Sequence, residues 1–206
     1  MRGVLTKGKV IRSGFGKDKA AGLFAGSLLA MFGKSLLLCS ALLTPAMTQT
    51  PHMPNTETQR EAMKKLSFLI GSWRGEARQY RGTAPVELIQ TEVAQYKLDG
   101  LILVIEGVGR TKSDGKAALQ AFGLVSYDDA TGAYHMRAFN DGLWLETDLK
   151  LADNGKGLTW GFVFGEIKTR SSLQITERGE WTEQHEITVG SAAPRKLMEV
   201  AVQRQE

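Results

Sequence analysis

The chain has 206 residues and a formal net charge of +4, but the positive charge is concentrated near one end. Residues 1–46 hold seven of the 26 basic residues and one of the 22 acidic residues. The other 160 residues therefore carry 19 basic and 21 acidic side chains, a net charge of about −2. A nucleic-acid-binding surface needs clustered positive charge to displace phosphate counterions, so the composition argues against a nucleic-acid partner.

The single cysteine, Cys39, also lies in this N-terminal part. The rest of the chain is therefore expected to contain no disulfide, no thiolate nucleophile and no cysteine-based metal site. Its length is sufficient for one domain with one hydrophobic core.

Residues 1–46 have the pattern of an export leader. A basic start is followed by a mostly apolar stretch from Ala20 and by a small-residue exit that ends at Ala46. This order of segments is typical of a secretory signal. Met31 begins a complete short signal of its own and is an alternative start of the protein.

The apolar stretch of the leader has a second reading, as a membrane anchor that is retained. Lys34 divides it into pieces shorter than the roughly 20 residues that a spanning helix needs. This favours cleavage, a periplasmic or secreted protein, and no stable membrane span after the leader is removed.

A polar linker at 47–55 precedes a predicted helix. Thr56 and Gln59 have the spacing of a capping box. Apolar residues then recur at helical spacing up to Leu69, and Gly71 ends the helix. The sequence therefore predicts a helix over 56–69.

From Trp73 onward the apolar period becomes two, which is typical of strands. The pattern predicts ten strands, at about 73–80, 86–97, 101–110, 117–127, 133–140, 143–151, 157–165, 167–177, 180–189 and 195–204. Asp-Gly and Asn-Gly pairs between them supply the positive φ of tight hairpins. Strands of even length with short hairpins form an up-and-down meander, and closure into a barrel removes its exposed edges. We therefore predict an all-β, ten-stranded antiparallel barrel over 56–206, capped by the short helix.

The stretch Phe68-Leu69-Ile70-Gly71-Ser72-Trp73 resembles the Gly-x-Trp opening of the calycin superfamily, which includes lipocalins, fatty-acid-binding proteins and nitrobindins. It is more closely similar to the DUF1579 family. That family closes with a Trp and acids in the penultimate strand and an Arg in the last, a pattern that residues 181–186 and Arg204 match. The resemblance covers residues 61–205. It implies a calycin-like barrel with an internal cavity and no established activity.

The two ends of this match are Trp73 and Arg204. In calycins the opening Trp and the closing Arg pack together and plug one end of the barrel. A guanidinium over an indole face gains a cation–π contact, so the expected role of the pair is structural. The alternative is that the two residues are unrelated.

Strand parity predicts which side chains point inward, because a shift of one residue reverses every side chain. Pairing across Gly165-Glu166 places Phe164 beside Ile167 and Trp160 beside Ser171. The bulky side chains then share one face, which we expect to line the barrel. The candidate ligand-binding residues are Met136, Trp160, Phe162, Phe164, Thr169, Ser171, Trp181, Glu183 and His185.

Glu183 and His185 stand two apart on one predicted strand face. Such a pair could act as acid and base or could bind the polar head of a ligand. The alternative is a buried histidine with its own hydrogen-bond partner and no further role. Of the other histidines, His135 is expected on the charged outer face, paired with Asp148.

The sequence favours an exported binding protein that holds a small, largely apolar, lipophilic molecule inside the barrel. The alternatives are an enzyme acting on a small lipophile through Glu183 and His185, and a structural module with a solid core. No catalytic residue, metal ligand or Gly-x-Ser-x-Gly elbow is assigned.

Haem is the cofactor that the resemblance brings into question. Nitrobindin-like barrels hold haem iron through a His in the final strand, whereas the final strand here offers only Met198. A thioether without an imidazole partner is a weak prospect as sole ligand. We therefore expect no cofactor, with His185 as the one inward candidate if haem binds.

Overall fold

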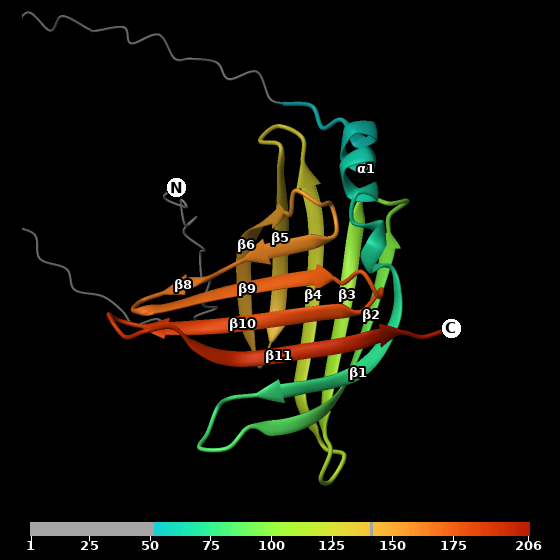
Figure 1. Ribbon diagram of the computed structural model, residues 1–206. Coiled ribbons are helices and arrows are strands. Elements are labelled where there is room, and N and C mark those ends of the chain that lie inside the picture. Colours follow the sequence, from blue (N-terminus) through green and yellow to red (C-terminus); the bar gives the residue numbers. More distant parts are fainter. Residues whose placement is uncertain (1–51, 141) are drawn as a thin grey trace, which may run out of the picture. The chain divides into compact units, whose positions relative to one another are not determined.

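The computed structural model describes residues 52–140 and 142–206, which form an antiparallel β-barrel preceded by one short helix (Figure 1). The predicted leader at 1–46 lies outside the described residues. The elements are α1 (Thr56–Lys64), the 3-10 helix η1 (Ser67–Leu69), β1 (Gly71–Gln79), β2 (Val86–Lys97), β3 (Ile102–Thr111), β4 (Ala117–Asp128), β5 (Ala133–Asn140), β6 (Leu143–Leu151), β7 (Gly157–Trp160), β8 (Val163–Phe164), β9 (Ile167–Ile175), β10 (Trp181–Val189) and β11 (Arg195–Arg204).

The sheet closes on itself. Neighbouring strands follow the order β10-β11-β1-β2-β3-β4-β5-β6-β7-β9, and β9 also pairs with β10. The short strands β7 and β8 both pair with β9 and together take the place of one strand. The predicted ten-stranded meander and its closure are therefore confirmed.

The strand predicted over 157–165 is interrupted at Gly161 and Phe162. The hydroxyl of Thr169 accepts a hydrogen bond from the backbone N–H of Phe162 at 3.0 Å, in place of a backbone carbonyl. A Cβ at Gly161 would lie 2.4 Å from the carbonyl oxygen of Thr169, so the close approach here requires glycine. The continuous-strand prediction was wrong because this break depends on a contact between two strands.

Helix α1 begins at Thr56, as predicted, but it ends at Lys64 instead of Leu69, and the predicted capping box of Thr56 and Gln59 does not form. Asn55 is the N-cap, and its Oδ1 accepts hydrogen bonds from the N–H groups of Glu57 and Thr58 at 3.1 and 3.0 Å. Gln59 does not reach back to the cap, because its side chain donates to Asp129 at 2.6 Å. The start of the helix is thereby attached to the hairpin between β4 and β5.

The end of α1 is held by two tyrosines of the barrel. The Tyr134 hydroxyl donates to the carbonyl of Ala62 and the Tyr96 hydroxyl to that of Met63, both at 2.6 Å. These two carbonyls also accept backbone hydrogen bonds from Lys65 and Leu66, at 3.1 and 2.9 Å, so the tyrosines add a second donor to each of them. They position α1 over the barrel end where the hydrophobic core lies.

The core is built from inward side chains near α1. The largest fully buried side chains include Met63, Leu66, Leu69, Trp73 and Trp181. Among the described residues there is no helix with both the length and the apolar character needed to cross a bilayer.

The predicted pairing of β9 is confirmed with both of its neighbours, β7 and β10. Trp160 lies opposite Ser171, and Trp181 lies opposite Ile175. These registers fix the inward parity of β7, β9 and β10, which carry most of the candidate site.

Candidate ligand-binding site inside the barrel

The inner face of the barrel has a packed part and a part that solvent reaches. Inward side chains close to α1, such as Tyr134 and Leu149, are buried. Further along the same strands, Met136 and Thr147 are only half-buried. The barrel is thus filled near α1 and accessible beyond it, an arrangement that suits a ligand site in a barrel.

A chain of hydrogen-bonded side chains crosses the inner face of β10 and β9. The indole N–H of Trp181 donates to Glu183 Oε1 at 2.8 Å, and Glu183 Oε2 lies 2.8 Å from His185 Nε2. His185 Nδ1 lies 2.9 Å from Ser171 Oγ. The side chains of His185 and Glu183 are 19% and 14% exposed, so this series of hydrogen-bonded side chains is largely shielded from solvent. The strand period of two brings positions 181, 183 and 185 to one face.

Two further polar side chains, Gln90 and Glu92, lie on the inner face of β2. Gln90 is fully buried, Glu92 is 8% exposed, and Gln90 Nε2 donates to Glu92 Oε1 at 2.6 Å. They face Gly109 and Gly107 of β3. A Cβ at Gly107 would lie 2.7 Å from a Glu92 oxygen, and one at Gly109 would lie 2.6 Å from Gln90 Oε1. The two glycines therefore provide the room that the polar pair occupies.

Sequence reasoning missed Gln90 and Glu92. Alternating glycines at 107 and 109 within one strand were the available signal, because glycine inside a strand often marks the close approach of another group. We call Gln90, Glu92, Ser171, Glu183 and His185 the interior polar cluster.

Glu92 is the most strongly perturbed acid of this cluster. Burial, and then the negative charge of Glu183, raise the pKa of the Glu92 carboxyl to about 8, against the opposing effect of the hydrogen bond from Gln90. Burial disfavours the charged form of a carboxyl group, and a nearby carboxylate does the same. Glu92 is therefore largely protonated at neutral pH, and the cluster can take up or release a proton in the physiological range.

Aromatic side chains border the cluster on the side of β7. The Trp160 ring lies edge-on to the His185 imidazole, with centroids 5.9 Å apart. Phe162 is half-buried beside Thr169. Phe164, predicted to line the interior, is 59% exposed at the β8–β9 hairpin, where the wall of the barrel ends.

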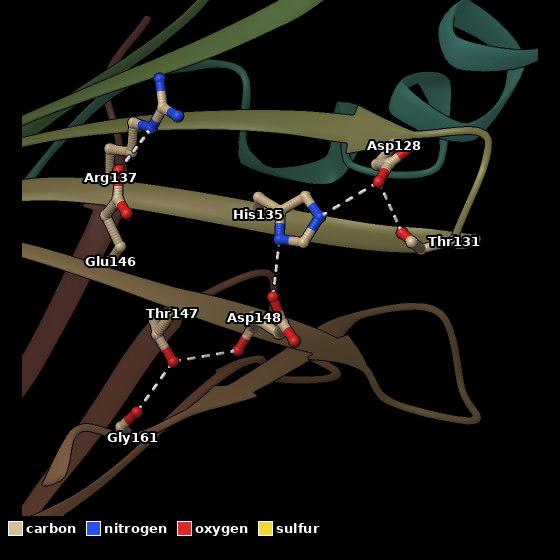
Figure 2. A network of polar contacts seen from close by, with 8 residues as sticks. All are labelled: Asp128, Thr131, His135, Arg137, Glu146, Thr147, Asp148 and Gly161. Carbon is tan, nitrogen blue, oxygen red and sulfur yellow. Dashed lines mark hydrogen bonds and ion pairs between the residues drawn. The ribbon is translucent and has the colours of Figure 1, made fainter. Parts of the chain in front are cut away.

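The wall between β6 and β7 is joined over a short distance only. These strands pair at Lys150–Thr159 and Leu151–Leu158. Beyond them, the Thr147 hydroxyl donates to the carbonyl of Gly161 at 2.8 Å (Figure 2). Within the described residues, the first half of β6 thus has no strand partner on this side, next to the half-buried aromatic residues.

The outer face of β5 and β6 carries a separate polar network, shown in Figure 2. His135 Nδ1 lies 2.6 Å from Asp148, and His135 Nε2 lies 3.7 Å from Asp128. Arg137 forms an ion pair with Glu146 at 2.9 Å. The predicted outward pairing is confirmed, and His135 belongs to the surface.

Trp73 and Arg204 lie directly opposite each other on β1 and β11. The guanidinium carbon lies 4.1 Å from the centre of the Trp73 ring. Arg204 also donates to the carbonyls of Ile70 and Phe68, the latter at 3.0 Å, and the indole N–H donates to Leu69 at 2.8 Å. The pair thus ties the first and last strands to the η1 segment.

The residues fit haem poorly, and we predict that a hemin titration gives no stoichiometric Soret shift. Both ring nitrogens of His185 already have partners, Ser171 and Glu183, so iron ligation would break one of these contacts. A sharp Soret shift in the wild type that His185→Ala removes would contradict this prediction.

For metal ions, no group of three or more His, Cys, Asp or Glu residues in the described ranges is arranged as a site.

Comparisons with known proteins bear on the fold. Fourteen chains of known structure are similar to this one. The crystal structure of Rv2717c from M. tuberculosis aligns with a TM-score of 0.54 over 70% of this chain and 98% of that chain, at 16% sequence identity. No protein-family model matches the chain, and no curated protein matches it. At this identity the likeness extends to the barrel fold alone.

Proposed function

We propose that this protein is an exported binding protein that holds a small, largely apolar molecule in the accessible part of the barrel. The apolar portion of the ligand would lie against Trp160, Phe162 and Met136. Its polar end would meet the interior polar cluster. Binding sites of this kind are mostly apolar, with a few polar groups that orient the ligand.

The observation that carries this proposal is the half-buried state of inward apolar residues next to a shielded polar cluster. A barrel packed solid would bury Met136 and Trp160 as completely as it buries Leu158 and Leu173, whereas both remain half-buried. Because β6 and β7 pair at two positions only, the wall between them offers a route by which a ligand could enter. Export rests on the leader pattern of residues 1–46, which supports a periplasmic or secreted location.

A fluorescent lipophilic dye should bind saturably to the wild-type protein, and Phe162→Glu should abolish this binding without unfolding the chain. A carboxylate at position 162 would put a charge among the apolar groups that contact the dye. The matched control is Phe139→Glu on the outer face, where Phe139 is 48% exposed, and this variant should bind like the wild type. Absence of saturable dye binding would favour a solid-core module.

A second candidate function is hydrolysis of a small lipophilic ester. Ser171, His185 and Glu183 are hydrogen-bonded in series at 2.9 and 2.8 Å, the order of nucleophile, base and orienting acid. If this is the function, the protein should hydrolyse a p-nitrophenyl ester and Ser171→Ala should abolish turnover. Ser171 itself is buried, and we therefore rank binding ahead of catalysis.

A further inference from the structure

One buried acceptor of the interior polar cluster has no donor among the described residues. Gln90 Oε1 is buried and has no hydrogen-bond partner among the residues that the structure describes. Its amide nitrogen is already used by Glu92. A buried acceptor without a donor costs free energy, so the site favours a ligand that supplies one.

The cluster also places two carboxyl groups in one interior, where the one basic side chain of the cluster, His185, contacts Glu183 and not Glu92. Glu92 lies opposite Trp73, whose ring packs against that of Trp181 with the ring centroids 5.3 Å apart. The Trp181 indole in turn donates a hydrogen bond to Glu183. In the described part of the chain, no Lys or Arg is among the groups that act on the Glu92 carboxyl. Buried carboxylates are normally paired with a cation.

We propose that the polar end of the ligand is a protonated amine, bound among the oxygens of Gln90, Glu92 and Glu183. This inference rests on the proposed binding function and adds the chemical class of the ligand, a lipophilic amine. An ammonium group supplies three N–H donors and one positive charge. One N–H would donate a hydrogen bond to Gln90 Oε1. The positive charge would offset the negative charge of the second carboxylate, and the hydrogen bonds to the carboxylates would be short and charge-assisted.

Binding of the amine exchanges one proton. The protonated Glu92 carboxyl loses its proton to solvent, and the ammonium ion takes its place as the group that neutralises the carboxylate. Glu183 on β10 acts on the Glu92 carboxyl from across the interior, and His185 contacts Glu183. At the level of Glu92, β1 and β3 present Trp73 and Gly107, neither of which titrates. The affinity for the amine should therefore rise as Glu92 becomes easier to ionise.

Three probes of equal chain length, octylamine, octanol and octanoate, separate charge from apolar contact. Calorimetric titration of the full chain should give at least about tenfold tighter binding of octylamine than of octanoate. Octylamine stays protonated from about pH 6 to about pH 8, because alkylamines ionise near the lysine value. Its affinity should increase over this interval by about tenfold or more, since the ionised fraction of Glu92 increases.

Glu92→Gln should weaken octylamine binding by at least about tenfold and flatten its pH dependence, while octanol binding changes by less than about twofold. Glu183→Gln serves as a second variant and should also weaken octylamine selectively, which keeps the test decisive if the first variant does not fold. Octylamine affinity that neither variant changes, or octanoate binding as tight as octylamine, would overturn the amine assignment while the lipophilic dye still binds. If neither the dye nor any octyl probe binds, the proposed function fails as well.

Discussion

Truncation of Trp73 to alanine is expected to lower the free energy of unfolding by about 3–5 kcal/mol, the range for a buried aromatic residue. Trp73 is 2% exposed and packs between Arg204 and Trp181. Its loss leaves a cavity at the joint between the first strand, the last strand and η1. Urea unfolding followed by far-ultraviolet circular dichroism measures the change.

Trp144→Ala is the matched control for Trp73→Ala. Trp144 is half-buried on the outer face and contacts Phe139, so the same truncation should cost clearly less. Arg204→Ala should be non-additive with Trp73→Ala, with a coupling of about 0.5–3 kcal/mol, because the two side chains touch. Equal losses in Trp73→Ala and Trp144→Ala, or simple additivity with Arg204→Ala, would contradict the structural role of the pair.

Replacement of Glu92 by glutamine is expected to make the barrel more stable than the wild type at high pH. In the unfolded chain this carboxyl releases its proton near 4.5, whereas in the folded chain the pKa is about 8. Between these values the folded state holds one more proton, so the stability of the wild type falls as pH rises, by about 1.4 kcal/mol per pH unit. Over the whole interval the loss is on the order of 5 kcal/mol, and it levels off once Glu92 is ionised in both states.

The difference in unfolding free energy between Glu92→Gln and the wild type isolates the contribution of the Glu92 carboxyl. Glutamine has the same shape and no titratable group, so the difference should grow in favour of the variant from about pH 5 to about pH 8. Glu106→Gln, at an exposed position on the outer face of β3, is the control and should leave the pH profile of the wild type unchanged. Parallel profiles for Glu92→Gln and the wild type would show that Glu92 is not held protonated by the fold.

The barrel could be predicted from the sequence because the residue patterns that specify its strands and hairpins are local. Asp114-Gly115 and Asn154-Gly155 mark hairpins, and both glycines have the expected positive φ of 70° and 67°. Short hairpins also fix the register, which is why the positions of Trp160, Trp181 and Glu183 on the inner face followed from parity.

Gln90 and Glu92 could not be predicted in the same way. The connection between β1 and β2 spans residues 80–85, long enough that its length does not set the register. Both faces of β2 mix polar and apolar residues, so the apolar pattern does not identify the inner one. The position of Glu92 is decided by its pairing with Trp73 and Gly107, which is a property of the folded sheet.

The hydrogen-bonded order of Ser171, His185 and Glu183 was only partly foreseen. Parity placed Ser171 across from the penultimate strand, but the contacts of the two imidazole nitrogens depend on side-chain rotamers. Rotamers are set by packing against neighbours such as Trp160, which sequence patterns do not specify.

Native mass spectrometry of the protein, purified from its source cells without denaturation, tests most directly whether a small molecule occupies the barrel. The wild type should carry one non-covalently bound small molecule per chain, which denaturation releases. Phe162→Glu prepared in the same way should show the mass of the chain alone, and Phe139→Glu should retain the ligand. A wild-type protein that shows only the mass of its own chain, as Phe162→Glu does, would contradict a ligand-binding interior.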